Sequence, residues 1–227
     1  MIVSKTSNAP SATLHPIASL VIVIDDDVDV RQSLENLLLS VELNVALFGS
    51  IAEFQAAQLP EVPTCMVLDI RLPGASGFDL QAHLERTGRH IPIIFMTGHG
   101  DISMSVRAMK AGALDFLTKP FRDQDLLDVV TEALERDRQR RHADVALQAI
   151  RELHAGLTPR EKEVMVLVTR GLLNKQIAGT MDLQEITVKI HRGNMMRKMG
   201  ARSLADLVRM AEAIGLHGPT SRLRPSM

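Results

Sequence analysis

Five short apolar segments separated by helical patterns are the strongest constraint on the fold of this chain. They lie at Leu20–Ile24, Asn44–Leu47, Cys65–Leu68, Ile91–Met96 and Ala113–Leu117. Amphipathic patterns alternate with them at Val28–Ser40, Ile51–Gln58, Gly77–Arg86 and Ile102–Ala111, and a fifth runs from Asp123 to about Arg136. Each apolar segment has the length of a buried strand. The alternation predicts a parallel sheet with helices on both faces.

A second domain of a different kind is indicated after residue 156. Thr158 stands as an N-cap, Pro159 takes the first helical position and Glu161 follows three residues after the cap, which marks a helix start. Helical patterns follow at Pro159–Arg170, Asn174–Met181, Glu185–Met199 and Ser203–Ile214. They predict a small all-α domain of four helices.

Shorter segments flank and join these two domains. Residues 137–156 are mostly polar, and their stretch from Ala143 to Leu153 has neither Gly nor Pro, so we expect a helical linker. Residues 1–19 show no periodicity and residues 217–227 contain Gly and Pro, so we expect a disordered N-terminal arm and a flexible tail. The domains themselves are expected at residues 20–136 and 157–216.

The charged side chains divide unequally along the chain. Residues 1–136 carry 10 basic and 18 acidic side chains, whereas residues 157–227 carry 12 basic and 6 acidic ones. The basic segment is therefore the candidate for binding a polyanion. The chain has no Trp and no Tyr, so it lacks the aromatic platform on which single-stranded nucleic acid stacks.

Several other classes of protein are excluded by simple counts. The single cysteine, Cys65, forms neither an internal disulfide nor a multi-thiolate zinc site, and we interpret it as a small buried hydrophobe. No apolar run approaches the roughly 18 residues that span a bilayer, and Met1–Ser19 lacks the pattern of a secretory signal. We expect a cytoplasmic protein with no membrane partner.

Polar residues gather where the predicted strands end. Asp25, Asp26 and Asp27 follow the first strand, Asp69 ends the third, Thr97 ends the fourth, and Lys119 follows the fifth. Ligands of such sheets bind at this edge, and carboxylates held together there repel one another unless a cation such as Mg²⁺ lies among them. A carboxylate beside Mg²⁺ can attack phosphorus, with a Lys and a hydroxyl stabilising the phosphoryl oxygens. Taken alone, three consecutive Asp residues are typical of a solvated turn.

These motifs resemble those of two-component response regulator receivers, from Val21 to about Arg136. The resemblance rests on Asp25-Asp26, Asp69-Ile70-Arg71-Leu72-Pro73-Gly74, Thr97-Gly98-His99-Gly100-Asp101 and Lys119-Pro120-Phe121, and Met104–Ala113 is similar to the FixJ-type subgroup. It implies a flavodoxin-like, doubly wound sheet of five parallel strands in the order 2-1-3-4-5. His99 and Asp101 suggest a proton relay, but we interpret them as a loop residue and a cap of the next helix.

The resemblance also implies a role for each residue of the site. Asp69 is the phosphoacceptor, Lys119 contacts the phosphoryl group, and Thr97 and Phe116 form the switch pair. Mg²⁺ is held by Asp25, Asp26, Asp69 and the backbone carbonyl of Arg71. Receivers of this family often have Tyr where Phe116 stands, so a hydroxyl is missing here. The face expected to dimerise carries Val106, Lys110 and Arg122.

Asn174–Met181 and Glu185–Met199 form a helix-turn-helix pattern with a basic second helix, which we expect in a major groove. On a helical wheel, Val188, Met195 and Met199 form the packed stripe, and Lys189 and Ile190 fall on the opposite face. That face also carries Ile186, Gly193 and Arg197. The base-reading candidates are Thr187, Lys189, Ile190, Asn194 and Arg197, and the phosphate-contact candidates are Lys175, Arg192, Lys198 and Arg202. The alternative is a basic helix that merely packs or is solvated.

This segment resembles the LuxR-type DNA-binding domain from Leu157 to about Leu216. The resemblance rests on Leu157–Glu161, Gly171–Ala178 and Thr187–Arg192. Two residues depart from the family pattern. Gln184 stands where a Ser or Thr cap is usual, which weakens a helix start by about 1 kcal/mol. Gly193 stands where some relatives carry a basic residue that reads bases, so one possible base contact is missing.

Together the resemblances imply a response regulator of the NarL/FixJ family. A sensor histidine kinase would phosphorylate Asp69, which would promote homodimerisation and binding to double-stranded promoter DNA, with transcriptional activation and contact with RNA polymerase expected by analogy. We expect that the protein is not an enzyme, and that its only reactions are self-phosphorylation from small donors and slow autodephosphorylation. One alternative is a phosphohydrolase, which usually has a second carboxylate where this chain has Arg71. The other is a regulator that works without phosphorylation.

Overall fold

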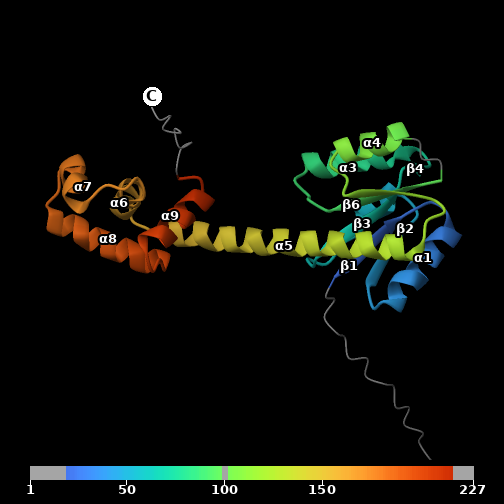
Figure 1. Ribbon diagram of the computed structural model, residues 1–227, viewed down its shortest axis with the longest axis horizontal. Coiled ribbons are helices and arrows are strands. Elements are labelled where there is room, and N and C mark those ends of the chain that lie inside the picture. Colours follow the sequence, from blue (N-terminus) through green and yellow to red (C-terminus); the bar gives the residue numbers. More distant parts are fainter. Residues whose placement is uncertain (1–18, 99–101, 217–227) are drawn as a thin grey trace, which may run out of the picture. The chain divides into compact units, whose positions relative to one another are not determined.

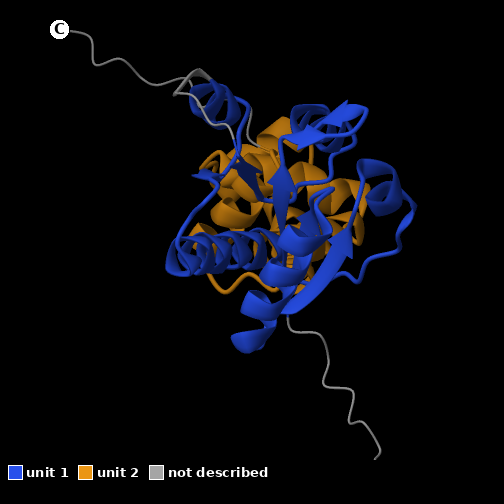
Figure 2. Ribbon diagram, turned by 90° about the vertical axis from the view of Figure 1, so that its right-hand side faces the viewer, with its two compact units in different colours: residues 1–141 blue, residues 142–227 orange. Residues whose placement is uncertain are grey.

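The computed structural model describes residues 19–98 and 102–216. The chain divides into two compact units, residues 1–141 and residues 142–227 (Figure 2). The expected C-terminal tail, and the expected N-terminal arm apart from Ser19, lie outside the described residues. So do His99 and Asp101, the loop and cap residues of the sequence prediction.

The N-terminal unit is built on a five-stranded parallel sheet (Figure 1). Its strands are β1 (Leu20–Ile24), β2 (Asn44–Phe48), β3 (Thr64–Asp69), β6 (Ile93–Thr97) and β7 (Asp115–Thr118). They lie in the order β2-β1-β3-β6-β7, and all neighbouring pairs run parallel. Counted as the five predicted strands, this order is 2-1-3-4-5, so the predicted fold class is confirmed.

Helices cover both faces of this sheet. On one face lie α1 (Val28–Ser40) and α5 (Asp123–Ala155), and on the other α2 (Ile51–Ala56), α3 (Gly77–Arg86) and α4 (Ile102–Lys110). Alternate residues of β1 enter the two cores, Val21 and Val23 on the α1 side and Ile22 and Ile24 on the α3 side. A strand buried on both faces reads as a continuous apolar run, which is why the pattern identified it.

Several element boundaries differ from the sequence prediction. The strand predicted from Ile91 begins at Ile93, and the one predicted from Ala113 begins at Asp115. A short antiparallel hairpin, β4 (Arg71–Leu72) with β5 (Ala75–Ser76), was not predicted. Two-residue strands are too short to show a periodic pattern. The hairpin turns at Gly74, whose φ of 77° favours glycine.

α5 runs from Asp123 to Ala155 without a break, so the fifth receiver helix and the expected linker are one helix (Figure 1). The C-terminal unit continues with α6 (Pro159–Thr169), α7 (Asn174–Met181), α8 (Glu185–Met199) and α9 (Leu204–Ala213). A capping box starts α6, in which the Thr158 and Glu161 side chains each accept from the other's backbone N–H. Within the described residues, no helix is long and apolar enough to cross a membrane.

The C-terminal unit has its own apolar core. Every helix from α6 to α9 contributes to it, and Ile150 of α5 packs against it. Its buried residues are Leu157, Val164, Met165, Val168, Ile177, Ala178, Val188, Met195, Met199, Leu207 and Ala211. Four short helices around one core are the small all-α domain that the sequence predicted.

Candidate functional site

The carboxyl ends of β1, β3, β6 and β7 carry the polar residues singled out in the sequence. Asp25 directly follows β1, Asp69 ends β3, Thr97 ends β6 and Lys119 directly follows β7. Asp25, Asp69 and Thr97 are buried, whereas Asp26 is exposed. Parallel strands present these ends on one edge of the sheet, so residues far apart in sequence meet there.

The Lys119 ammonium lies between two carboxylates. Its Nζ donates to Asp25 Oδ2 at 2.5 Å and to Asp69 Oδ2 at 2.7 Å. Although burial by itself lowers the pKa of Lys119, the hydrogen bonds to Asp25 and Asp69 hold that pKa above its ordinary value. Burial raises the pKa of Asp25, against the opposing effect of the Lys119 hydrogen bond. Lys119 therefore supplies the positive charge that two neighbouring carboxylates require.

Backbone contacts fix the orientation of both carboxylates. Asp69 Oδ1 accepts from the N–H of Arg71 at 2.8 Å, and Asp25 Oδ1 accepts from the N–H of Asp27 at 3.0 Å. Each carboxylate thus uses one oxygen for the backbone and the other for Lys119. The Arg71 side chain is exposed, so only its backbone takes part in this arrangement.

Gly77, at the first position of α3, lets the helix start pack directly against the phosphoacceptor candidate. A Cβ added at Gly77 would lie 2.7 Å from the carbonyl oxygen of Asp69 and 3.0 Å from Cε1 of Phe95. No side chain fits at these distances, so Gly77 is required by the packing around Asp69. The sequence predicts a helix start at this glycine but not its role, because only the packed structure reveals that contact.

The oxygen donors at this edge suit a small hard cation. Asp25 and Asp69 offer carboxylates, and Mg²⁺ typically takes only one or two protein carboxylates while it keeps several waters. In residues 19–98 and 102–216, however, no three acidic, His or Cys side chains are grouped closely enough to hold a metal ion. The Lys119 ammonium occupies the space between Asp25 and Asp69, and Asp26 is exposed.

The predicted switch residues lie on neighbouring strands. Thr97 is fully buried at the end of β6, and its carbonyl oxygen accepts from the N–H of Lys119 at 2.8 Å. Phe116 on β7 is half-buried and packs against the core on the α3 side of the sheet. A backbone hydrogen bond thus joins the Thr97 strand end directly to the segment that carries Lys119.

The predicted dimerisation residues are exposed. Val106 and Lys110 lie on the outer surface of α4, and Val106 is 45% exposed. Met109, which was not among the predicted residues, is 49% exposed on the same helix. Arg122 is exposed at the start of α5 and donates to both carboxylate oxygens of Asp125, at 2.9 and 2.6 Å.

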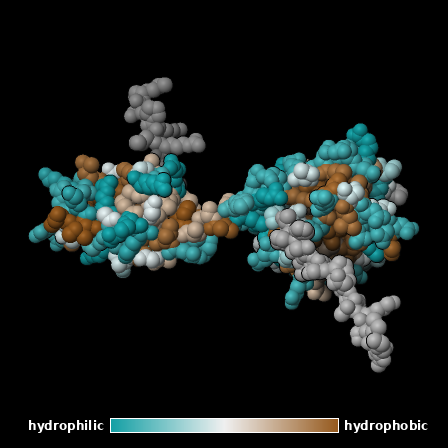
Figure 3. Space-filling model, turned by 90° about the horizontal axis from the view of Figure 1, so that it is seen from below, coloured by the Kyte–Doolittle hydropathy of each residue, from teal (hydrophilic) through white to brown (hydrophobic). Residues whose placement is uncertain are grey.

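α7 and α8 form the predicted helix-turn-helix. Asp182 in the connecting turn has a left-handed backbone. Gln184, the N-cap residue of α8, makes no side-chain cap hydrogen bond, as expected from its residue type. The buried residues of α8 are Val188, Met195 and Met199, which confirms the packed stripe. Ile186 and Ile190 on the opposite face are 59% and 56% exposed, and hydrophobic side chains are visible among hydrophilic ones on this unit in Figure 3.

The remaining DNA-contact candidates differ in their surroundings. The exposed ones are Lys175, Lys189, Arg197 and Arg202, and the half-buried ones are Thr187, Arg192 and Asn194. Arg192 donates to Asn174 Oδ1 at 3.0 Å and Arg197 to Asn194 Oδ1 at 2.8 Å. These contacts hold two guanidinium groups in place on the surface of the helix-turn-helix.

Lys198 has an acidic partner within its own domain. Its Nζ donates to Glu161 Oε2 at 2.6 Å, and that carboxylate is buried at the start of α6. The hydrogen bond from Lys198 holds the pKa of Glu161 below its usual value. The Lys198 charge is therefore already compensated by the ion pair, and its contact with DNA phosphate stays a prediction. From the sequence, Glu161 was predicted only as part of a capping box.

Comparisons with known proteins follow the same division of the chain. The model of the response regulator receiver domain matches residues 21–131, and that of the luxR family of bacterial regulatory proteins matches residues 155–211. Nodulation protein W of Bradyrhizobium diazoefficiens is 57% identical over 198 residues, which cover 87% of this chain and 87% of that protein. The transcriptional regulatory protein FixJ of Azorhizobium caulinodans is 43% identical over 194 residues, 86% of this chain and 92% of that protein. The solved structure of response regulator StyR matches with a TM-score of 0.77 and 47% identity, over 86% of this chain and 98% of that one.

Proposed function

Because this chain belongs to the two-component response regulators that join a receiver domain to a LuxR-type DNA-binding domain, we propose that phosphorylation of Asp69 controls its binding to promoter DNA. The observation that carries this proposal is the Lys119 ammonium, which lies 2.7 Å from Asp69 and 2.5 Å from Asp25. It places a cation beside a buried carboxylate at the edge of the sheet where ligands bind.

The phosphoryl group comes from a histidine of a sensor kinase. A carboxylate oxygen of Asp69 forms the new bond to phosphorus as the bond from phosphorus to the histidine nitrogen breaks, which leaves an acyl phosphate. Lys119 then turns from the Asp69 carboxylate to the phosphoryl oxygens. Asp25, Asp26, Asp69 and the backbone carbonyl of Arg71 would hold Mg²⁺, which would supply further neutralisation of the transferred charge.

Loss of the Lys119 hydrogen bond to Asp69 couples this chemistry to the rest of the receiver. The backbone of Lys119 is bonded to Thr97, so a change at Lys119 reaches the ends of both β6 and β7. Thr97 turns its hydroxyl to the phosphoryl group, and Phe116, which is half-buried, moves further inward. The surface around Val106, Lys110 and Arg122 then pairs with a second copy of the chain. The exposure of Val106 and Met109 supports this face, because two large apolar side chains side by side favour burial in a partner.

Dimerisation brings two copies of α8 to the DNA. Binding of the second helix becomes an intramolecular event at high effective concentration, which raises occupancy of a two-fold related site. Lys189 and Ile190 read bases in the major groove, and Lys175 and Arg192 contact phosphates. The exposed Ile186 and Ile190 support this assignment, since exposed apolar residues on a basic helix suit contact with thymine methyl groups.

The chain acts as a phosphoacceptor and not as an enzyme, with at most slow turnover of its own acyl phosphate. Arg71 stands where an aspartyl phosphohydrolase carries its general acid, which argues against that alternative. Bound at a promoter, the dimer activates transcription through contact with RNA polymerase. Its partners, a sensor kinase and chromosomal DNA, place its action in the cytoplasm.

The test compares the wild type with Asp69→Asn after addition of Mg²⁺ and acetyl phosphate. Asn keeps the shape and the hydrogen bond to the N–H of Arg71 but is no nucleophile. We expect the wild type to gain one acid-labile phosphoryl group by intact mass and to sediment as a dimer. The matched control is Asp128→Asn on the exposed surface of α5, which should behave as the wild type. If Asp69→Asn still dimerises and binds DNA like the treated wild type, the proposal is wrong.

A further inference from the structure

Gln81 on α3 has a buried side-chain oxygen that lacks a donor. The side chain is 4% exposed, and its Nε2 donates to the carbonyl oxygen of Ala111, just after α4. Its Oε1 is buried and accepts no hydrogen bond from any residue that the structure describes. Exchanging the two ends of the amide would bring two oxygens together, so Ala111 fixes its orientation. A buried acceptor without a donor destabilises a protein, and the described part of the fold supplies none here.

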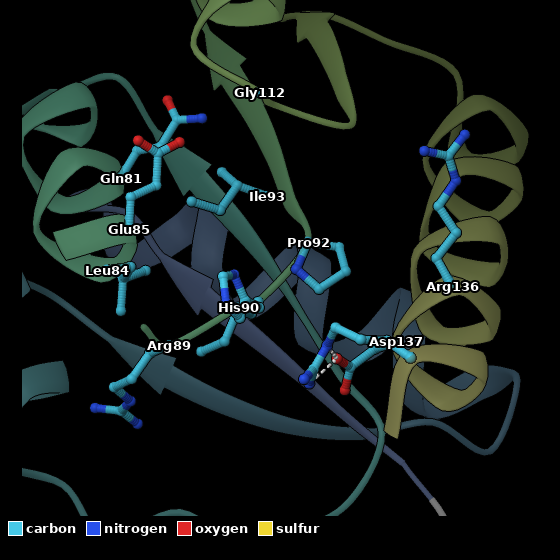
Figure 4. A pocket seen from close by; sticks show the side chains of 12 residues that line it. Gln81, Leu84, Glu85, Arg89, His90, Pro92, Ile93, Gly112, Arg136 and Asp137 are labelled. Carbon is cyan, nitrogen blue, oxygen red and sulfur yellow. Dashed lines mark hydrogen bonds and ion pairs between the residues drawn. The ribbon is translucent and has the colours of Figure 1, made fainter. Parts of the chain in front are cut away.

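Glu85, one turn further along α3, is a second acceptor at the same place. Its carboxylate is exposed and forms no hydrogen bond or ion pair within the described part of the chain. The position that a Cβ of Gly112 would take lies 3.5 Å from Glu85 Oε1 and 4.0 Å from Gln81 Nε2. The two side chains therefore end beside the same glycine, and Figure 4 shows their polar ends together. A cationic N–H donor is the group that such a pair of acceptors binds most strongly.

Both side chains line a cleft of about 250 Å³ between α3, the start of β6 and α5 (Figure 4). The cleft lies where β6 begins, whereas Asp69 lies at the opposite end of the sheet, where β3 ends. Its apolar lining comes from Leu84 and from residues 91–93. Across the opening from Glu85 stands Arg136 on α5, which is exposed and pairs through Nη2 with Glu132. A guanidinium group carries five N–H donors, so Arg136 has others to offer a bound anion.

The charges around this cleft suit a molecule that carries both signs. The Asp137 carboxylate on the α5 wall is already compensated, because Thr64, Arg140 and Arg141 all donate to it. A purely anionic molecule would meet Glu85 on the α3 wall, and a purely cationic one would meet Arg136 on the α5 wall. A molecule with an amino group at one end and a carboxylate at the other meets a complementary charge on each wall.

We propose that this cleft binds a small amphoteric molecule whose amino group and carboxylate are separated by a short carbon chain. The amino group bonds to Glu85 and to Gln81 Oε1, the carboxylate bonds to Arg136, and the chain lies over Pro92 and Ile93. The volume fits this class, since pockets for drug-sized molecules start at about 300 Å³. Gln81 Oε1 is covered, so the exposed Glu85 side chain turns as the amino group enters. This binding does not depend on phosphorylation of Asp69.

The experiment uses the full-length chain without a phosphodonor. The probes are ω-aminobutanoate, ω-aminohexanoate and ω-aminooctanoate, each titrated while NMR follows the side-chain amide of Gln81 and the backbone amide of Gly112. We expect at least one of these probes to shift both resonances in a saturable way. Hexylamine and hexanoate, which keep one charged end each, should bind about 10-fold more weakly or worse, because each lacks a charge-assisted hydrogen bond.

Two variants test the two ends of the cleft separately. Glu85→Gln and Arg136→Gln should each weaken binding of the best probe by about 10-fold, because each removes one of the charges that the probe contacts. Both side chains are exposed, so the variants should fold like the wild type. The matched control is Asp128→Asn, which removes an exposed carboxylate of α5 that does not line the cleft and should leave the affinity unchanged.

Three outcomes would overturn the inference. If none of the three ω-amino acids shifts the Gln81 amide, the cleft is only a solvated surface. If hexylamine binds as tightly as ω-aminohexanoate, Arg136 takes no part and the amphoteric class is wrong. If Glu85→Gln binds like the wild type, the amino group does not lie where we place it. Asp69→Asn should bind the best probe like the wild type, so a failure of the proposed function would leave this result unchanged.

Discussion

Asp137 on α5 accepts a 2.9 Å hydrogen bond from the backbone N–H of Thr64, the first residue of β3 and 73 residues earlier in the chain. The Asp137 side chain is 1% exposed and also accepts from Arg140 and Arg141. It lies at one wall of a cleft of about 250 Å³ whose other wall includes Gln81 and Glu85 of α3 (Figure 4). This contact ties α5 to the sheet at the point where the helix continues toward the C-terminal unit.

Replacing Asp137 by Ala should destabilise the receiver by about 3 kcal/mol, because it leaves the buried N–H of Thr64 without its acceptor and removes the carboxylate that pairs with Arg141. Urea unfolding followed by circular dichroism measures this change. The control is Glu132→Gln on the same helix, whose partner Arg136 and own side chain are both more than half exposed. That substitution should cost less than about 1 kcal/mol. Equal effects of the two substitutions would contradict a special role of Asp137.

The Asp137 carboxylate should also make the stability of the receiver depend on pH in the acidic range. Although burial by itself raises the pKa of Asp137, hydrogen bonds from Arg141, Arg140 and the Thr64 N–H bring it below the ordinary value of 3.8. Because the pKa of Asp137 is lower in the folded state, its carboxylate contributes its full stabilisation when the pH is above the ordinary pKa. This stabilisation is lost as the pH falls through the lowered pKa of the folded state. We expect the difference in unfolding free energy between the wild type and Asp137→Asn to shrink as the pH falls below about 4. A difference that stays constant with pH would rule out this linkage.

Lys119→Gln should slow phosphorylation of Asp69 by acetyl phosphate about 100-fold, because it removes the cation that stabilises the transferring group. Glutamine keeps much of the length of the lysine side chain and can still donate a hydrogen bond. A slower phosphorylation rate therefore reports on the loss of the positive charge. The rate is followed by intact mass over time. Arg122→Gln removes an exposed positive charge from the same strand-to-helix segment and serves as the control. Equal rates for Lys119→Gln and the wild type would remove Lys119 from the chemistry.

Gly77→Ala should both destabilise the receiver and slow phosphorylation. The added Cβ would lie 2.7 Å from the Asp69 carbonyl oxygen and 3.1 Å from Cγ of Leu68, so the start of α3 or the end of β3 must shift. Overpacking of this kind costs about 1 to 3 kcal/mol. At Gly49 an added Cβ has its nearest contact at 3.5 Å and the backbone is not left-handed, so Gly49→Ala is the control. Chemical unfolding and the phosphorylation rate should change together in Gly77→Ala alone.

Glu161→Gln should weaken the DNA-binding domain through the position of α8. The Glu161 carboxylate accepts from the backbone of Thr158 at 2.8 Å and from Lys198 at 2.6 Å, so it joins the start of α6 to the end of α8. The glutamine amide can still cap α6 but cannot form the ion pair with Lys198. We therefore expect the unfolding free energy of the domain, measured by calorimetry, to fall by about 2 kcal/mol. DNA affinity should fall as well, because α8 loses one of its supports. Glu163→Gln breaks an exposed pair with Arg160 and should change neither quantity.

The sequence by itself determined the element pattern, because periodicity and capping are local properties. The bounds of α1, α3, α7 and α8 agree with the prediction at both ends. The packed stripe of α8 and the missing cap at Gln184 were also predictable, since a helical wheel and a residue type are enough to infer them. The strand ends pointed to Asp25, Asp69 and Lys119 for the same reason, because a parallel sheet places such residues on one edge.

Tertiary structure alone decided the contacts between these elements. Three of these contacts join residues that lie 37 to 94 positions apart in the sequence. Lys119 bridges Asp25 and Asp69, Asp137 contacts Thr64, and Glu161 pairs with Lys198. No periodic pattern encodes such distances. The need for glycine at position 77, and the lack of any such need at position 193, likewise depend on which atoms pack beside each residue. Close packing is a property of the assembled fold, so these functional details became visible only there.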